Sequence, residues 1–207
     1  RIFKPEPCPH SYCQDMTTTP NSPSSAAAPG TSGVTGRHTT GGVPHGVTTL
    51  TPFLAVPNAR EAINFYRDVF GARLIDATEM GGIVVHADLD FGSGRLQLGE
   101  PNPDYGLVPA PEGDADCYSM GLYCENADET VARAETAGAT VREPLTTFVS
   151  GDRFASIRDP FGVRWSVMSR VEDLSEEESA ARVAEWAAGQ GMSAGSGEDV
   201  QADSGKN

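Results

Sequence analysis

Few side chains in this sequence could act as an acid, a base or an anion-binding group. His86 is the only histidine in the region predicted to fold, so it is the candidate catalytic residue for proton transfer near neutral pH. The alternative is a strand histidine that is solvated or satisfied by a neighbouring carboxylate, Asp88 or Asp90. Arg158 could bind an anionic ligand, or it could pair with the adjacent turn aspartate, Asp159.

The motifs of other common catalytic sites are missing from the sequence. There is no Gly-x-Ser-x-Gly elbow, no Walker phosphate loop and no glycine-rich dinucleotide fingerprint. Cys117 and Cys124 lie at opposite ends of one predicted strand and on opposite faces of it, so no disulfide framework is expected. Cys8, His10 and Cys13 could be zinc ligands, but no second cluster follows them, and an unstructured leader with two thiols is favoured.

The composition is typical of a soluble protein. The formal net charge of −14 argues against a nucleic-acid partner and against an anionic membrane surface. No apolar run approaches the roughly 18 residues that span a bilayer, and the first residues lack the apolar core of a secretory signal. We therefore expect a cytoplasmic protein with no nucleic-acid partner and no membrane partner.

Changes in composition divide the chain into four parts. Residues 1–46 are rich in Pro, Gly, Ser and Thr, and they are predicted to be a disordered leader. The folded domain is expected over residues 47–171, followed by a C-terminal helix over 172–190. Residues 191–207 are predicted to be a disordered tail.

The folded region contains an internal repeat. In each copy a helical stretch begins after an asparagine, at Asn58 and at Asn126, with a glutamate three positions on, as in a helix N-cap. Each helix is followed by strands, two of which turn on a Phe-Gly pair. The sequence therefore predicts two strand–helix–strand–strand–strand modules, over about 48–100 and about 116–170.

Alternation of apolar residues predicts which strand faces are buried. In the first strand Leu50 and Leu54 are expected on the buried face. In a later strand of the same module Val85 and Leu89 are expected there. Trp165 is in phase with the apolar residue two positions on, so it is expected in the core.

Several motifs within the two modules match a known family. They lie at residues 51–57, 62–66, 69–72, 86–89, 151–154, 158–162 and 165–166. With them the sequence resembles the vicinal oxygen chelate superfamily, which includes glyoxalase I, bleomycin-resistance proteins and extradiol dioxygenases, and in particular its PhnB-like branch. The resemblance implies an α+β fold in which each module forms half a barrel, with helices outside and a ligand cavity inside. It also implies a homodimer.

Metal-using members of that superfamily carry their ligands on the first and fourth strands of each module. The repeat places the equivalent positions at Thr51 and Ser119 and at Gln97 and Ser166. Divalent transition metals favour imidazole, thiolate or carboxylate ligands, and three hydroxyls and one amide make a poor site. We therefore predict no metal and no other cofactor.

The remaining cavity positions mix apolar and hydrogen-bonding side chains, which is typical of a small-molecule site. The predicted ligand-binding residues are Thr51, Phe53, Gln97, Ser119, Tyr123, Ser156, Arg158 and Ser166. Further predicted lining residues are His86, Arg95, Gly121, Phe154, Arg164 and Met168. The interpretation is a metal-independent protein, similar to glyoxalases and bleomycin-resistance proteins, that binds a small aromatic or anionic molecule in the cleft between the modules.

Two other hypotheses stay open. One is a metal-dependent lyase, isomerase or dioxygenase of the same superfamily, for which His86, Gln97 and Glu100 would be a partial ligand set. The other is a second module that serves mainly as a dimerisation partner. Tight metal binding that depends on His86 would contradict the metal-independent interpretation, whereas a metal-free protein with a saturable small ligand would support it.

Overall fold

The computed structural model describes residues 32–191 of the chain. The chain divides into two compact units, residues 1–42 and residues 43–207. The first unit contains β1 (Thr39–Thr40), and the second begins with β2 (Val43–Pro44). Both short strands lie within the predicted leader. The zinc candidates Cys8, His10 and Cys13 lie outside the described residues.

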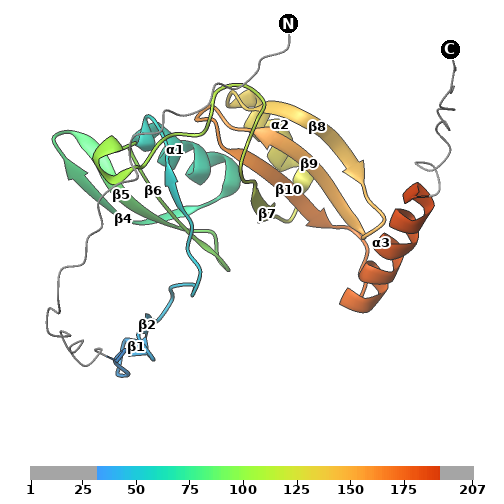
Figure 1. The fold of residues 1–207 in the computed structure, drawn as a ribbon, viewed down its shortest axis with the longest axis horizontal. Helices are drawn as coiled ribbons and strands as arrows, with labels where there is room; N and C mark the ends of the chain where they lie inside the picture. The colour runs from blue at the N-terminus through green and yellow to red at the C-terminus, as the bar shows by residue number, and fades with distance from the viewer. Residues whose placement is uncertain (1–31, 192–207) are drawn as a thin grey trace, which may run out of the picture. The chain divides into compact units, whose positions relative to one another are not determined.

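The second unit contains two modules of the predicted order, each with one helix and a four-stranded sheet (Figure 1). The first consists of β3 (Phe53–Ala55), α1 (Ala59–Phe70), β4 (Arg73–Met80), β5 (Ile83–Asp90) and β6 (Arg95–Gly99). The second consists of β7 (Met120–Tyr123), α2 (Ala127–Thr136), β8 (Thr140–Thr147), β9 (Asp152–Arg158) and β10 (Arg164–Arg170). The strand orders are β3-β6-β5-β4 and β7-β10-β9-β8, with the first and fourth strands of each module parallel. The predicted α+β fold is confirmed.

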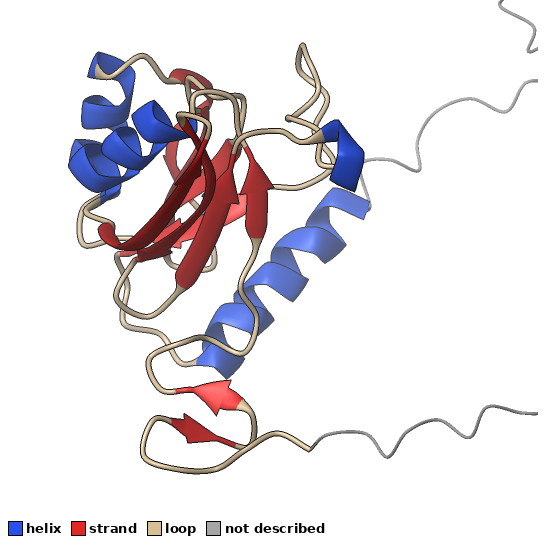
Figure 2. Cartoon of the chain, turned by 90° about the vertical axis from the view of Figure 1, so that its left-hand side faces the viewer, coloured by secondary structure: helices blue, strands red, loops and turns tan. Residues whose placement is uncertain are grey.

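The core lies between the helices and the sheets. α1 and α2 lie on the same side of the strands (Figure 2). Leu89, Leu98, Ile157 and Val167 are fully buried on the helix side of their strands. Trp165 is 2% exposed, so its predicted place in the core is confirmed.

Aromatic side chains join the two modules. The Trp165 ring lies 4.7 Å from Phe70, 5.3 Å from Tyr66 and 6.2 Å from Phe91 (centroid distances). The Tyr66 hydroxyl, on α1, donates a 2.7 Å hydrogen bond to the buried carboxylate of Asp159 in the β9–β10 turn. Burial raises the pKa of Asp159, and the hydrogen bonds that it accepts partly offset this rise.

Two expectations about the strands of the first module are wrong. Leu50 is 83% exposed, because the first strand begins only at Phe53. In β5, a register shift opposite β4 leaves Val85 as an extra residue, and Val84 is buried in its place. Beyond this bulge the alternation resumes, and Leu89 is buried as expected.

The two modules begin their helices differently. Asn126 accepts a 3.1 Å hydrogen bond from the Glu129 backbone N–H, so its predicted capping role is confirmed. Asn58 instead has a left-handed backbone (φ 55°), and its side chain makes no cap. The Glu100 carboxylate, from the end of β6, accepts hydrogen bonds from the N–H groups of Asn58 and Ala59. The first helix is therefore capped by a residue that is 41 positions from Ala59 along the chain, which the sequence could not indicate.

The C-terminal helix, α3 (Glu176–Gly191), begins with a capping box at Ser175, whose hydroxyl accepts a hydrogen bond from the Glu178 N–H. Trp186 packs edge-on against Phe148 at 5.0 Å between ring centroids. Ala180, Ala184 and Ala187 of this helix are exposed and Val183 is half-buried, so the helix covers little of the domain.

The short helix η1 (Pro103–Tyr105) lies in the linker between the modules. Cys117 lies farther along this linker, and Cys124 lies just after β7. Both are outside the strand that was expected to contain them. Both are free thiols. None of the described helices has the length and apolar character needed to cross a bilayer.

Candidate functional site

Each sheet has one face covered by its helix and one face turned away from it, here called the open face. Residues in register across neighbouring strands share a face. On the first sheet the open face carries Phe53, His86, Asp88, Arg95 and Gln97. On the second sheet it carries Tyr123, Phe154, Ser156, Arg164, Ser166 and Met168. Most of the predicted ligand-binding side chains therefore lie on the two open faces.

The strand register equates the predicted ligand positions of the two modules. Gln97 lies opposite Phe53 in the parallel pair β3–β6, and Ser166 lies opposite Gly121 in the parallel pair β7–β10. Thr51 lies two positions before Phe53, and Ser119 lies two positions before Gly121. The two predicted positions of each module therefore have the same relation to each other. The equivalence that the repeat predicts is therefore present in the structure.

The four equivalent positions do not fit a divalent transition metal. The hydroxyl oxygens of Ser119 and Ser166 are 3.0 Å apart and bond to each other. The Thr51 hydroxyl donates to the Thr48 carbonyl at 3.0 Å, and Gln97 offers a neutral amide. Within residues 32–191 no three His, Cys, Asp or Glu side chains gather as metal ligands.

Glu100, the third member of the alternative ligand set, serves another role. Its two carboxylate oxygens accept hydrogen bonds from the first N–H groups of α1, at 3.1 and 2.8 Å. A metal bound by this carboxylate would compete with the helix cap.

His86 lies on the open face of the first sheet, half-buried beside Phe53 at 6.1 Å between ring centroids. Neither carboxylate expected as its partner contacts it. Asp88 pairs with Arg95 at 3.1 Å, and Asp90 pairs with Arg73 at 2.7 Å. Nothing in the described part of the chain therefore orients the imidazole as a general base.

Some of the predicted lining residues are divided between two cavities. A cavity of about 220 Å³ at the junction of the modules is lined by Arg95, Gly121 and Tyr123, together with Phe91 and Trp165. This volume is below the range of about 300–1,000 Å³ that small-molecule pockets occupy.

A larger cavity, of about 470 Å³, lies on the open face of the second sheet. Its walls are mostly apolar, from Phe148, Phe154 and Met168, and its polar residues include Glu143 and Asp152. Phe154 and Met168 are predicted lining residues, whereas Phe148 and Glu143 were missed. Glu143 lies where β8 departs from regular pairing, and the proline after it was the only sequence signal of this irregularity, whereas Phe148 lies in the loop that follows β8.

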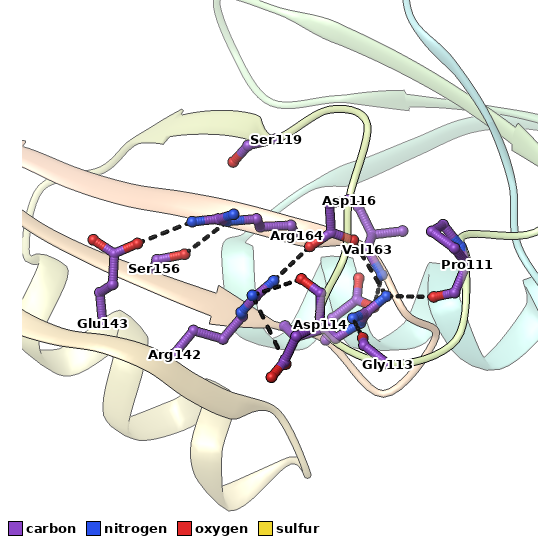
Figure 3. Close-up of polar contacts among 12 residues, drawn as sticks. Pro111, Gly113, Asp114, Asp116, Ser119, Arg142, Glu143, Ser156, Val163 and Arg164 are labelled. Atoms are coloured by element: carbon purple, nitrogen blue, oxygen red, sulfur yellow. Dashed lines mark hydrogen bonds and ion pairs between the residues drawn. The ribbon is translucent and has the colours of Figure 1, made fainter. Parts of the chain in front are cut away.

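The polar side chains beside this cavity bond to one another (Figure 3). Ser156 is fully buried and accepts a 3.1 Å hydrogen bond from Arg164 Nε. Arg164 Nη2 lies 2.9 Å from a Glu143 oxygen. Of the three, Ser156 is covered, and only Arg164 and Glu143 present polar atoms to a ligand.

Tyr123 lies at another edge of the same open face and is 59% exposed. Its hydroxyl donates to Asp152 at 3.3 Å, and Asp152 also binds Arg170 at 2.8 Å and Ser150 at 2.7 Å. Burial by itself would raise the pKa of Asp152, but the Ser150 and Arg170 contacts outweigh it and lower that pKa. The group is therefore an anion at neutral pH.

Arg158 binds the linker between the modules. Its guanidinium donates to the Pro111 carbonyl at 2.7 Å and pairs with Asp116 at 3.2 Å. Arg142 reaches the same Asp116 carboxylate from β8 (Figure 3). The expected pairing of Arg158 with Asp159 is therefore wrong, because Arg158 pairs with the Asp116 carboxylate of the linker.

Comparison with known proteins agrees with this architecture. The family model for the glyoxalase/bleomycin resistance protein/dioxygenase superfamily matches residues 42–167. The chain belongs to this superfamily, as its motifs predict.

Relatives and similar structures have been identified. An uncharacterized protein of Mycobacterium bovis is 31% identical over 139 residues, which is 62% of this chain and 88% of that protein. Among solved structures, TioX from Micromonospora sp. is 25% identical (62% of this chain, 100% of that chain, TM-score 0.47). A PhnB protein from Bacillus cereus is 19% identical (59% and 99%, TM-score 0.47).

Proposed function

We propose that this chain is a metal-independent member of the superfamily that binds a small aromatic molecule and does no bond chemistry on it. The observation that carries the proposal is the cavity of about 470 Å³ on the open face of the second sheet. This volume is within the range of drug-sized pockets, and the junction cavity is not.

The chemistry of the walls indicates the kind of ligand. Phe148, Phe154 and Met168 offer ring and thioether surfaces, on which a flat apolar molecule gains contact area. The polar groups of the lining include Glu143 and Asp152, and Arg164, which pairs with Glu143, could receive an anionic substituent. These features support an aromatic ligand with one polar end.

Two observations support metal independence. The positions equivalent to metal ligands hold hydroxyls and an amide, and the serine pair is satisfied internally. The only histidine of the folded modules has no described carboxylate to orient it. The homodimer that the resemblance implies and the cytoplasmic location expected from the composition stay predictions.

The proposal is tested by titration with N-phenyl-1-naphthylamine, a neutral dye whose fluorescence rises in apolar surroundings. We expect saturable binding of one dye per chain. Phe154→Ala should weaken it about tenfold, because one aromatic wall of the cavity is lost. Phe154 is half-buried on the open face, so this change should leave the fold intact.

Phe53→Ala is the matched control, since Phe53 lies on the open face of the other sheet. Its dye affinity should equal that of the wild type. Unchanged binding in Phe154→Ala, or a loss in Phe53→Ala alone, would contradict the assignment of this cavity.

A further inference from the structure

One row of residues is in register across all four strands of the second sheet, on its open face. Ser166 on β10 lies opposite Ser156 on β9, and Ser156 lies opposite Glu143 on β8. On the other side of Ser166 the row ends at Gly121 on β7. Apart from the chain neighbours of Gly121, the nearest described atom to where its β-carbon would stand is the Met168 methyl carbon, at 3.4 Å. The glycine therefore leaves space beside Ser166.

The guanidinium of Arg164 lies over this row (Figure 3). Its Nε donates a 3.1 Å hydrogen bond to Ser156, which is fully buried, and its Nη2 donates a 2.9 Å hydrogen bond to Glu143. Among the described residues nothing accepts a hydrogen bond from its Nη1. A buried hydroxyl thus fixes the guanidinium in place, and the guanidinium keeps donors for a further acceptor.

Two serine hydroxyls beside the guanidinium offer another donor. The hydroxyl oxygens of Ser119 and Ser166 are 3.0 Å apart, and neither has a further partner among the described residues. Only one of their two protons can lie in this contact, so the other proton is free to bond an acceptor. Ser166 lies directly opposite Ser156, which places their β-carbons about 4.5–5.5 Å apart. Because Arg164 is bonded to Ser156, one oxyanion can contact the guanidinium and the Ser166 hydroxyl together.

This end of the sheet has more positive than negative charge, although the chain as a whole carries a formal charge of −14. Arg142 and Arg158 share one carboxylate, that of Asp116. Arg164 lies directly opposite Arg158 and pairs with Glu143. Like charges directly opposite each other destabilise a sheet, so an anion bound at Arg164 would relieve this repulsion.

The carboxylates that could cancel this excess are exposed to solvent. The Glu143 side chain is 54% exposed. The Asp114 side chain is 95% exposed and lies 3.7 Å from Arg142. Exposed ion pairs contribute little free energy, so an anion that also bonds the serine hydroxyls can displace Glu143 from Arg164.

We propose that the open face of the second sheet binds a tetrahedral oxyanion, a phosphate or sulfate group, between Arg164 and the hydroxyls of Ser119 and Ser166. The donors come from β10 and from the segment before β7, so they surround the anion from more than one direction, which suits a tetrahedral group better than a flat carboxylate. The guanidinium also disfavours a metal cation at the same hydroxyls. This inference does not depend on binding in the dye cavity, because an inorganic ion has no ring to place there.

The experiment is a titration of the ¹⁵N-labelled full chain with inorganic phosphate, sulfate and acetate at constant ionic strength, with amide shifts followed by NMR. We expect phosphate and sulfate to shift the amides of Ser119, Gly121 and Ser166 saturably, at millimolar concentration. Acetate should bind about tenfold more weakly. A further titration with phenyl phosphate distinguishes the source of the group: tighter binding than inorganic phosphate assigns it to an aromatic ligand, and equal binding assigns it to the free ion.

Variants locate the site. Arg164→Gln should weaken phosphate binding about tenfold, and Ser166→Ala should weaken it severalfold. Glu143→Gln should instead tighten phosphate binding severalfold, because it removes the carboxylate that competes for Arg164. Arg182→Gln is the matched control, since Arg182 on α3 likewise pairs with a glutamate at 2.8 Å, and it should change nothing. If Arg164→Gln does not fold, Glu143→Gln decides, because that side chain is exposed.

Four results would overturn the proposal. One is the absence of saturable shifts at these amides. Another is wild-type phosphate affinity in the folded Arg164→Gln variant. The third is unchanged or weaker phosphate binding in Glu143→Gln. The fourth is acetate binding as tightly as phosphate, which would make this a carboxylate site.

Discussion

Asp159→Ala is expected to lower the free energy of unfolding by about 3–5 kcal/mol. The buried carboxylate accepts hydrogen bonds from Tyr66 Oη at 2.7 Å and Trp165 Nε1 at 2.9 Å. It also accepts the backbone N–H groups of Phe161 and Val163, both at 2.9 Å. The change leaves these donors without an acceptor and removes the bond between α1 and the second module. Urea unfolding measured by tryptophan fluorescence gives the loss.

Tyr66→Phe is the matched control, because it removes one donor and keeps the ring packing. It should cost about 1 kcal/mol. If Asp159→Ala cost no more than this, the carboxylate would not be the link between the modules.

The same residue gives the stability a pH dependence. Because burial raises the pKa of Asp159 from its ordinary 3.8, the folded chain holds the proton to higher pH than the unfolded chain. The contribution of Asp159 protonation to the free energy of unfolding is therefore fully present below pH 3.8, and it is lost as the pH rises through the pKa of Asp159 in the folded chain. The side chain of Asp159→Asn cannot titrate, so the unfolding free energy of this variant should not show this decrease with rising pH.

Asp116→Ala is expected to cost about 2–3 kcal/mol of unfolding free energy. The Asp116 side chain is 5% exposed and pairs with both Arg142 and Arg158. Its loss leaves two largely buried guanidiniums without their common carboxylate, and it frees the linker from the second sheet. Chemical denaturation measures the loss, and limited proteolysis should show faster cutting between residues 106 and 119.

Asp114→Ala is the control for this effect. Asp114 lies on the same linker and 3.7 Å from Arg142, but its side chain is 95% exposed. Exposed ion pairs contribute little, so this variant should stay within about 0.5 kcal/mol of the wild type. Equal losses in the two variants would show that burial of Asp116 does not matter.

Local signals in the sequence were sufficient for most of the fold. The Asn126 cap and the alternation that buries Trp165 each depend on residues close along the chain. The repeated pattern of helical and strand signals in the two modules predicted the element order. The resemblance to a known family added the arrangement of the sheets.

The errors occur where a distant residue replaces a local one. Glu100 caps α1 in place of Asn58, and Arg158 forms its ion pair with Asp116 and not with Asp159. The bulge that moves Val85 out of the core depends on how β4 and β5 pair. None of these partners is fixed by spacing along the chain, so a reading of periodicity could not find them.

The candidate site was predicted only in part for the same reason. Counting from the repeat located the equivalent strand positions, because strands keep their register. It did not indicate that only some of the predicted residues line a cavity, or that these divide between two cavities. Phe148 contributes from a loop and Glu143 from an irregular strand, and neither has a periodic signal.

Elemental analysis of the protein, purified without chelators or affinity nickel and then titrated with Zn, Ni, Mn and Fe(II), tests the central claim most directly. The account predicts far less than one metal per chain, no rise in melting temperature with any of the four ions, and dye binding unchanged by EDTA. One tightly bound divalent metal per chain, lost in His86→Ala, would contradict it and support the metal-dependent enzyme.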